Sequence, residues 1–461
     1  MGKSKIWRLL AMLLAFSLVA AACGSGDEEV ATDDGDTTTT ETTATDDGEM
    51  TETTATEDDG EMTEDDGEMT ESATVEAAPT CAGDSDGVLQ IGGLLPQTGN
   101  LAFLGPPEEA GAALAVEEIN AAGGVNGADV VFSPGDSSDN ADVANQTVDR
   151  HLASGVDVIL GAASSGVSFT VIDKITQNCK IHFSPANTSP DFTDYAEDDL
   201  YFRTAPSDIL QGRVLADLIV NEGNTTVTLM ALQDPYGEGL LRFTKEPLEE
   251  AGVEVVEDFV YDPTAQNFDA EVQKVIAAGA EAVVVIGFDE SATILTGLFE
   301  AGVEGTIYLV DGNIGNALGA KFSEPGVLEG IKGTLPAAEI TADFRDRLLA
   351  VDPALVDFSY GPETYDAVII SALAAQAAGT DNPAEMAKVM NGVTRDGEKC
   401  TSFADCKALL EAGTDIDYDG PSGPQAFGPA GEPTEASFAI LQYGNDNQID
   451  ASLTTYQFAK L

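Results

Sequence analysis

From Val88 onward, short apolar runs alternate with stretches in which apolar residues recur every three or four positions. The run VLQIGGLLP (88–96) predicts a strand, and PPEEAGAALAVEEINAA (106–122) predicts a helix with proline and acidic residues in its first turn. Further strands are expected at 128–134, 156–161 and 181–185, and helices near 139–153 and 166–177. Strands that alternate with helices in this way predict a parallel sheet wrapped by helices.

The same alternation starts again after YFRTAP (201–206). Helices are expected at 207–221, 236–251, 268–278 and 291–301, and strands at 225–232, 253–262, 281–288 and 306–312. The rest of the chain predicts a strand at 331–337, helices at 343–350, 361–378 and 383–391, and two strand-like runs at 436–444 and 451–458. The simplest α/β architecture is two lobes of similar size, each a doubly wound parallel sheet. Ligands of such sheets bind at the carboxyl ends of the strands.

The first 22 residues follow a different pattern. Lys3, Lys5 and Arg8 precede an apolar run that ends in small residues, which is typical of an export signal and short for a membrane span. Ala20-Ala21-Ala22-Cys23 resembles the bacterial lipobox, although leucine is preferred where Ala20 stands. That resemblance implies that Cys23 is lipidated and anchors an extracytoplasmic protein to the membrane; the alternative is a plain signal peptide.

Residues 23–85 are expected to form a disordered tether. DDGEMTE occurs three times (46–52, 58–64 and 65–71), and the stretch from Asp27 to Glu76 holds 21 acidic residues and no Lys or Arg. Such a segment buries too little apolar surface to offset its ordering entropy, and its charges repel one another. A solvated spacer is therefore favoured over a cation-capturing segment.

The remaining chain is also acidic. Outside residues 1–22 and 27–76 it keeps 60 acidic and 17 basic side chains, a formal charge of about −43. This balance argues against nucleic acid as a partner, because phosphate contacts require clustered Lys and Arg.

Four cysteines remain once Cys23 is assigned to the lipid, and an even number in an exported protein suggests disulfides. Cys400 and Cys406 can close a small loop by themselves. Cys81 and Cys179 would then form the second pair, which ties the start of the folded region to the loop before a strand.

Enzyme and metal signatures are thin in the folded region. It has no CxxC, GxSxG, HExxH or GxxxxGK[ST], and no GxGxxG opens a helix. The only histidines, His151 and His182, lie far apart in sequence, and neither is placed to act as a base for Ser165. We therefore expect neither an enzyme nor a cofactor or metal site.

Six stretches in order resemble the branched-chain amino acid substrate-binding proteins of ABC transporters, in the type I periplasmic binding protein family. They are IGGLLPQTGNLAFLGPPEEAGAALAVEEINAAGGVNG (91–127), VILGAASSGVSFTVIDKI, FSPANTSPDFT, DPYGEGL, IGFDESATIL and VDG. The resemblance covers nearly everything from Val88 to the end. It implies two lobes joined by a three-crossing hinge, which close on a small ligand and then dock on a membrane permease.

By this resemblance, the first lobe comprises residues 86–204 and 335–427, and the second comprises 205–334 and 428–461. A monomer is expected, with a small-molecule ligand and an ABC transporter permease as its partners.

The resemblance also implies the ligand-binding residues. Ser165 matches the serine that binds the ligand's carboxylate, and Asn187 and Thr188 lie in a second loop of the same lobe. Hydroxyl and backbone N–H donors are what a desolvated carboxylate requires.

In the second lobe, Asp311 matches the acidic residue that binds the ammonium group, and Tyr236 matches a tyrosine that closes over the ligand. Phe288 stands at a strand end where relatives often carry an aromatic residue. Leu104 stands where some amino acid binders have a tyrosine. The resemblance therefore does not determine which ligand side chain the pocket prefers. A zwitterion would thus connect the two lobes.

Three alternatives remain open. The same module could present its closed form to a membrane signalling protein, or bind short amides, urea or aromatic acids. An enzyme on a similar frame would lack an evident acid–base set.

The stretch DIDYDGPSGP (415–424) begins like a calcium-binding loop, but Ala426 stands where the bidentate glutamate belongs. The resemblance instead identifies it as a turn before the last crossing. Asp417, Asp419 and Ser422 are then expected mainly to satisfy backbone N–H groups.

Overall fold

The computed structural model describes residues 78–461. The expected signal peptide (1–22), Cys23 and most of the expected tether therefore lie outside the described residues. In the described part of the chain, no helix is both long and apolar enough to cross a membrane.

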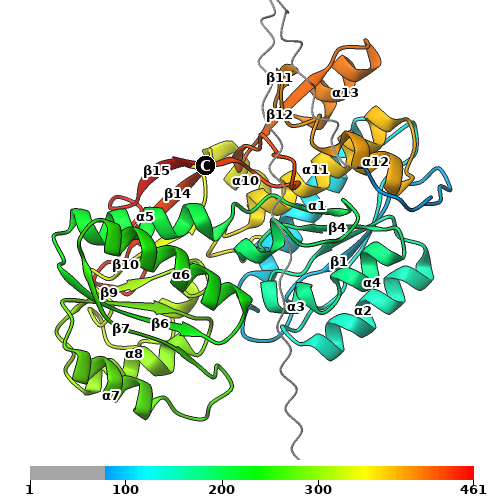
Figure 1. Cartoon of the computed structure of the whole chain (residues 1–461). Helices are drawn as coiled ribbons and strands as arrows, with labels where there is room; N and C mark the ends of the chain where they lie inside the picture. The colour runs from blue at the N-terminus through cyan, green and yellow to red at the C-terminus, as the bar shows by residue number, and fades with distance from the viewer. Residues whose placement is uncertain (1–77) are drawn as a thin grey trace, which may run out of the picture. The chain divides into compact units, whose positions relative to one another are not determined.

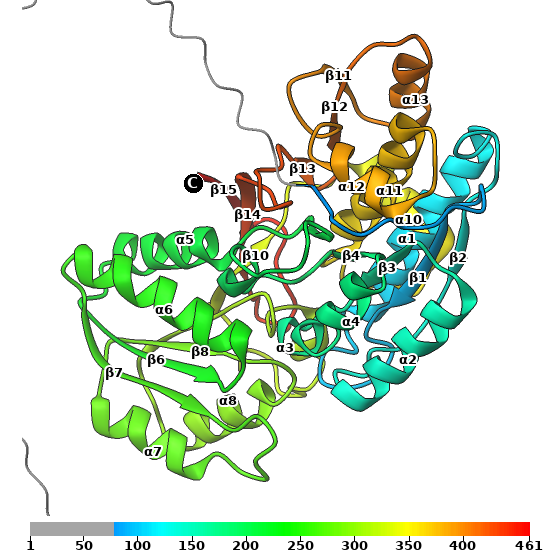
Figure 2. The same ribbon diagram turned by 45° about the vertical axis from the view of Figure 1, so that its right-hand side comes forward.

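Five parallel strands form the first sheet, in the order β2-β1-β3-β4-β5 (Figures 1 and 2). In β3, Val158 and Leu160 pack into the apolar cluster on one face, whereas Ile159 packs into the cluster on the other. A strand that is covered on both faces is apolar at consecutive positions, as the sequence run predicted. The strands are β1 (Gln90–Leu94), β2 (Val131–Ser133), β3 (Val158–Gly161), β4 (Ile181–Ser184) and β5 (Tyr201–Arg203).

Helices cover both faces of this sheet, and we call the sheet with its helices the first lobe. The helix that contains Gly111 packs closely against the helix that begins at Gly361. A Cβ atom at position 111 would lie only 2.3 Å from the carbonyl oxygen of Gly361, so glycine permits this approach. The helices are α1 (Gly105–Ala121), α2 (Ala141–Ser154), α3 (Ser165–Phe169), α4 (Ile172–Gln177), α10 (Ala342–Val351), α11 (Gly361–Ala378) and α12 (Pro383–Met390), with a short 3-10 helix at Pro190–Phe192.

The single helix expected at 166–177 is wrong, because α3 and α4 are separate. The hydroxyl of Thr170 donates to the carbonyl oxygen of Val167 at 2.7 Å, and Val171 has a φ of −123°, outside helical geometry. The β-branched run Thr170-Val171-Ile172 favours such a break.

The second sheet has seven strands in the order β15-β14-β10-β9-β8-β6-β7. Figure 1 shows α5 and α6 on one face and α7 and α8 on the other. We call this sheet with its helices the second lobe. Its strands are β6 (Thr226–Leu232), β7 (Glu254–Tyr261), β8 (Ala282–Ile286), β9 (Thr306–Leu309), β10 (Lys332–Pro336), β14 (Glu435–Gln442) and β15 (Thr455–Lys460), and its helices are α5 (Asp208–Asn221), α6 (Pro235–Glu250), α7 (Asp269–Ala278), α8 (Ser291–Glu300) and α9 (Asn316–Gly319).

The second sheet is parallel, as expected, from β10 to β7, and antiparallel at the other edge. β14 runs antiparallel to β10, and β15 runs antiparallel to β14. No helix lies between β14 and β15, and consecutive strands without a crossover helix pair antiparallel.

Three chain crossings connect the lobes. They lie side by side, since one small cavity of about 10 Å³ is lined by residues of all three. These residues include Thr204 and Pro206 after β5, Pro336 and Ala337 after β10, and Pro424 and Pro433 before β14.

A small three-stranded sheet projects from the first lobe (Figure 1). Cys400 and Cys406 form a disulfide there, with their Cα atoms 5.3 Å apart. The elements are β11 (Glu398–Cys400), α13 (Phe403–Glu411), β12 (Ile416–Gly420) and β13 (Gly423–Pro424).

The acidic stretch at 415–424 forms β12 and the turn into β13, but its side chains differ from expectation. Lys399 on β11 lies opposite Asp417, and its ammonium nitrogen is 2.9 Å from an Asp417 oxygen and 2.8 Å from an Asp419 oxygen. Ser422 donates its N–H and its hydroxyl to Asp366. The expected role of these side chains in satisfying backbone N–H groups is therefore wrong, because their partners in the described residues are the ammonium group of Lys399 and the side chains of Asp366 and Gln425.

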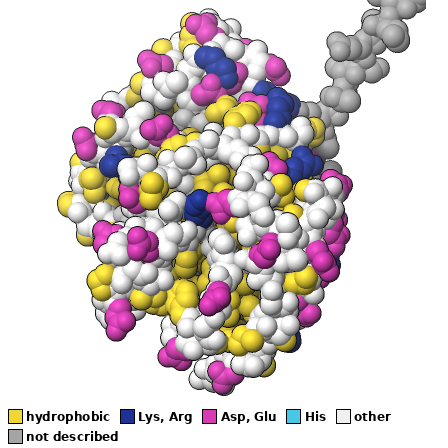
Figure 3. Space-filling view, turned by 90° about the vertical axis from the view of Figure 1, so that its left-hand side faces the viewer, with side chains coloured by type: hydrophobic (Ala, Val, Ile, Leu, Met, Phe, Trp, Pro, Cys, Tyr) yellow, Lys and Arg dark blue, Asp and Glu magenta, His cyan; other side chains and the backbone are white. Residues whose placement is uncertain are grey.

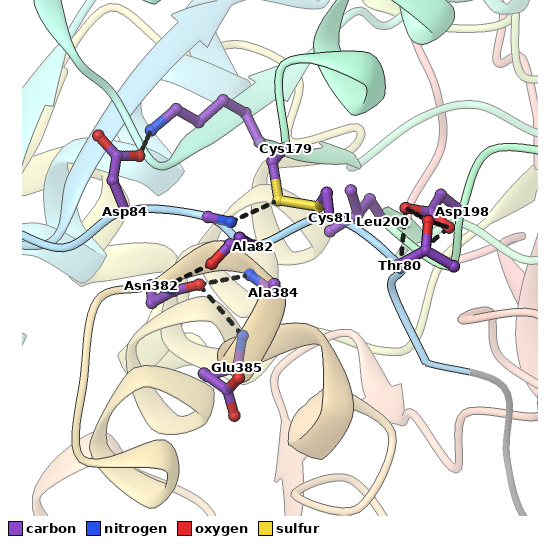
Figure 4. Close-up of a disulfide and its surroundings, with 12 residues drawn as sticks. Thr80, Cys81, Ala82, Asp84, Cys179, Asp198, Leu200, Asn382, Ala384 and Glu385 are labelled. Carbon is purple, nitrogen blue, oxygen red and sulfur yellow. Dashed lines mark hydrogen bonds and ion pairs between the residues drawn. A yellow bond between two sulfur atoms is a disulfide. The ribbon is translucent and has the colours of Figure 1, made fainter.

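Residues 80–88 are fastened to the first lobe (Figure 4). A disulfide joins Cys81 to Cys179, just before β4, with Cα atoms 5.8 Å apart. Thr80 donates its N–H and its hydroxyl to the carboxylate of Asp198. The N–H groups of residues 86–88 donate to one oxygen of Asp381, at 2.9–3.2 Å. Residues 80–85, which the sequence analysis assigns to the tether, thus make fixed contacts.

Candidate ligand-binding site

Two loops at the carboxyl ends of β3 and β4 supply hydroxyl groups from the first lobe. Ser164 caps α3, since its hydroxyl oxygen accepts from the N–H of Val167 at 3.3 Å. Ser165 follows it and is 2% exposed. Its hydroxyl oxygen accepts from the N–H of Ser189 at 3.3 Å, which joins the first loop to the second. Thr188, in the second loop, is also buried.

Asn187 lies in the same second loop, and it is not among the residues that line the cavity described below. Its amide group donates to the carbonyl oxygens of Ala162 and Ala163 at 3.0 and 2.9 Å. Its amide oxygen accepts from the hydroxyl of Tyr201 at 3.1 Å. Asn187 therefore holds the two loops together from behind.

Asp311 follows β9 in the second lobe, and the residue is 4% exposed. One oxygen accepts from the Gln211 amide at 2.7 Å and from the Tyr236 hydroxyl at 2.8 Å. The other accepts from the Tyr360 hydroxyl at 2.7 Å. Burial raises the pKa of the Asp311 carboxyl, and these three hydrogen bonds oppose the shift. The ion pairs within residues 78–461 do not include Asp311.

Two stacked aromatic rings stand beside this carboxylate. Tyr236 begins α6, where Asp234 caps the helix by accepting from the N–H of Gly237 at 2.8 Å. Its ring lies 5.5 Å from that of Phe288, which follows β8, with an angle of 12° between the planes. Gly312 permits this packing, since a Cβ there would lie 3.0 Å from both the Phe288 ring and the Tyr236 hydroxyl.

A narrow cavity of about 10 Å³ lies between the two lobes at the carboxyl ends of their strands. Of the seven residues predicted from the sequence, six line it, and Asn187 is the exception. The lining residues are Leu101, Leu104, Ala163, Ser164, Ser165, Ala186, Thr188, Tyr236, Phe288, Asp311, Gly312 and Tyr360.

Tyr360 lines the cavity and binds Asp311, but it was not predicted from the sequence. It precedes α11 with a φ of 58°, a left-handed conformation that is uncommon for a tyrosine. The sequence Tyr-Gly-Pro at the start of a long apolar helix was the feature that could have pointed to this residue. Its hydroxyl crosses from the first lobe to Asp311 in the second.

The histidines lie apart from this cavity. His151 contacts the carbonyl oxygen of Gly93 at 2.8 Å through Nε2, and His182 is fully buried in β4. Burial lowers the pKa of His182 to about 4. Residues 78–461 contain no cluster of three or more His, Cys, Asp or Glu side chains that could hold a metal ion.

Comparison with known proteins agrees with this architecture. The profile of the periplasmic binding protein family matches residues 88–448. Leu/Ile/Val-binding protein homolog 1 of Brucella suis is 30% identical over 308 residues, which cover 64% of this chain and 80% of that protein.

Two solved structures share the fold. A branched-chain amino acid transporter substrate-binding protein from Streptococcus pneumoniae, in complex with isoleucine, has a TM-score of 0.67 at 21% identity, over 81% of this chain and 100% of that chain. A solute-binding protein of an ABC transporter from R. palustris, in complex with benzoate, has a TM-score of 0.65 at 18% identity, over 79% and 95%. This chain therefore belongs to the periplasmic binding protein family, a family of solute-binding proteins.

Proposed function

We propose that this protein captures a free α-amino acid with an apolar, branched side chain and delivers it to the permease of an ABC importer. The observation that carries the proposal is the buried carboxylate of Asp311, which has three neutral donors and no cationic partner in residues 78–461. A buried charge without a counter-charge is costly, and a ligand ammonium group would neutralise it.

The rest of the cavity complements the other parts of such a ligand. Ser165 and Thr188 offer hydroxyl groups to a carboxylate from the opposite lobe. Leu104, Phe288 and the ring of Tyr236 offer apolar surface to a side chain. One zwitterion would then bridge the lobes, and its binding would favour the closed arrangement because only that arrangement satisfies both ends.

The lobes that would move are those bounded by the crossings near residues 204, 335 and 427. We further propose that the protein is a monomer outside the cytoplasm, held at the membrane by a lipid on Cys23. The signal-like start and the lipobox support the anchor, and the acidic spacer would give the lobes reach to the permease.

The ligand class follows from the charges of the site, because the fold alone is shared by a leucine/isoleucine/valine-binding protein homolog and by a benzoate complex. A benzoate-like anion has no cation to offer Asp311. We therefore expect amino acids to bind and simple carboxylic acids, short amides and urea not to bind.

A thermal-shift panel tests this function. Leucine, isoleucine, valine, alanine, benzoate, propionamide and urea are each added to the purified protein. A ligand at about 100 times its dissociation constant adds about 2.7 kcal/mol of stability, so the branched amino acids should raise Tm by several degrees. A Tm that no α-amino acid changes would refute the proposal, and a shift with benzoate alone would reassign the ligand class.

A further inference from the structure

A second and much larger cavity lies in the first lobe. Its volume is about 470 Å³, which is within the range of pockets that hold small molecules. It is lined by residues from three parts of the chain: the segment 192–202, which ends in β5, the segment 387–391 at the end of α12, and residues 429–431 of the crossing before β14. None of its lining residues lines the cavity between the lobes. The proposed capture of an amino acid therefore does not use this cavity.

Aromatic rings supply much of the apolar lining. Phe192 and Tyr201 stack with their centroids 4.6 Å apart and their planes 10° apart. Tyr195 packs against Phe169 at 5.4 Å, and its hydroxyl donates to Asp173 at 3.1 Å. Rings that are fixed by such contacts form a rigid apolar surface, suited to an aromatic or other apolar group of a ligand.

Three acidic side chains, those of Asp194, Glu197 and Asp199, also line the cavity. No ion pair within residues 78–461 includes any of them. Lys388 is the one base among the lining residues, and its ammonium nitrogen lies 2.7 Å from a carboxylate oxygen of Glu385. The lining thus carries an excess of negative charge, which favours a cation and disfavours an anion.

Glu197 is held in place by the backbone of its own loop. Its Oε2 atom accepts from the N–H groups of Leu200 and Tyr201, at 2.5 and 2.8 Å. These two bonds leave its other oxygen, Oε1, without a hydrogen bond in the described part of the chain. Burial raises the pKa of the Glu197 carboxyl to about 7, although the two N–H groups oppose the shift.

Asn391 gives independent evidence for a ligand. It lines the cavity and is only 9% exposed. Its side-chain amide forms no hydrogen bond within residues 78–461, and its amide oxygen is buried without a partner. A buried polar group without a partner is costly, and most such groups in folded proteins are hydrogen-bonded. A ligand that donates an N–H would give Asn391 the partner it lacks.

We propose that this cavity is a second binding site, for a small organic cation in which an apolar group carries an amidinium, guanidinium or ammonium group. The aromatic rings contact the apolar group of the ligand. Glu197 and Asp199 neutralise its charge, and the amide oxygen of Asn391 accepts one of its N–H groups. The site is separate from the cavity between the lobes, so it does not depend on the proposed function.

Benzamidine, benzamide and benzoate test the proposed ligand class, because they have nearly the same shape and are positive, neutral and negative. Each is titrated into the purified protein and followed by ligand-observed NMR at pH 8, where Glu197 is mostly ionised. Salt at about 0.15 M limits attraction to the overall negative charge of the protein. Benzamidine should bind saturably with a Kd of about 1 mM or below, and the other two at least about tenfold more weakly.

The double variant Asp194→Asn/Asp199→Asn tests the location of the site. Asparagine tolerates the left-handed backbone of position 199, whose φ is 56°. Loss of two partly exposed charges should weaken benzamidine binding about tenfold. Glu117→Gln/Asp129→Asn is the matched control, since it removes the same charge at two exposed positions of the first lobe outside the cavity. This control should bind benzamidine as the unaltered protein does.

Ala430→Trp is a second, independent variant, because a large ring at this lining position should fill the cavity and abolish binding. Absence of saturable benzamidine binding to the unaltered protein would overturn the proposal, and equal binding of the three probes would overturn the cation assignment. Equal benzamidine affinity in the two double variants, with Ala430→Trp also unchanged, would show that the cation binds elsewhere. The comparison of probes on the unaltered protein decides the ligand class even if a variant fails to fold.

Discussion

Asp311 is held by three neutral donors, from two tyrosines and a glutamine, and these donors come from both lobes. The hydrogen bonds fix its position in the absence of ligand. They leave its negative charge only partly compensated, because a neutral donor supplies a dipole and not a counter-charge. Such an arrangement is suited to a cationic group of a ligand.

Replacing Asp311 should therefore remove binding with little effect on folding. Asp311→Asn keeps an acceptor for one or two of the donors, but it cannot neutralise an ammonium group. Truncating one partner of a buried charge pair costs about 2–5 kcal/mol, so leucine affinity should fall at least about 30-fold by titration calorimetry. Glu300→Gln, at an exposed carboxyl of the same lobe, is the control. Unchanged affinity in Asp311→Asn would take this residue out of the site.

Sequence reasoning found most of the cavity because its residues follow predicted strands. Ser165, Thr188 and Asp311 all stand where a strand ends, and strand ends are recognisable from apolar runs. It could not place the side chain of Asn187, because sequence does not tell on which side of a loop a polar side chain lies. It missed Tyr360, which lines the cavity but stands before a helix and not after a strand.

At the scale of elements, α11 carries two buried acids close to the crossings, Glu363 and Asp366. Asp366 accepts from the Tyr418 hydroxyl at 2.7 Å and from the N–H of Ser422 at 2.9 Å. Burial raises its pKa to about 7, although these hydrogen bonds oppose the shift. Its carboxyl thus joins α11 to the small sheet and the last crossing.

An acid whose folded pKa lies above its unfolded value binds more protons when folded, so its contribution favours the folded state at low pH. The free energy of unfolding should therefore fall as pH rises from about 4 to about 7. Asp366→Asn should flatten this slope. The difference in the free energy of unfolding between pH 4 and pH 7 should shrink by at most about 4 kcal/mol, because each unit of pKa shift corresponds to about 1.4 kcal/mol.

Urea unfolding at several pH values between 4 and 8 measures this slope. The variant is also expected to lose some stability at every pH, because an amide NH₂ cannot accept from Ser422; the slope is the diagnostic quantity. Asp346→Asn, on the exposed face of α10, should keep the original slope. The same slope in both variants would show that Asp366 is not the titrating group.

Periodicity predicted most long elements of both lobes, because their buried faces repeat regularly. It failed where local chemistry competes with the pattern. The hydroxyl of Thr170 breaks a predicted helix, and β14 and β15 pair antiparallel because no helix separates them. The small sheet around Cys400 was not foreseen, since β11 and β13 have three and two residues and carry no periodic signal.

At the scale of the whole molecule, charge and cross-links act in opposite directions. Asp and Glu side chains are spread over the face shown in Figure 3. A formal charge of about −43 outside residues 1–22 and 27–76 destabilises the compact state through self-repulsion. The two disulfides counter this by restricting the unfolded chain.

The disulfides should contribute unequally, because they close loops of different length. Cys81 and Cys179 are 98 positions apart, whereas Cys400 and Cys406 are 6 apart. The chain-entropy relation gives about 4–5 kcal/mol for the first and about 2 kcal/mol for the second. Urea unfolding of the two double serine variants measures both costs. A larger loss from the 400–406 pair would contradict this order.

The fastening of residues 80–88 also determines how the protein bears a pulling force. Tension applied ahead of Thr80 passes through a covalent bond to Cys179, while hydrogen bonds to Asp198 and Asp381 share the load. All three receiving residues belong to the first lobe, so strand β1 is not peeled from its sheet. The second lobe bears none of this tension, so a pulling force on the N-terminal segment does not oppose its movement relative to the first lobe.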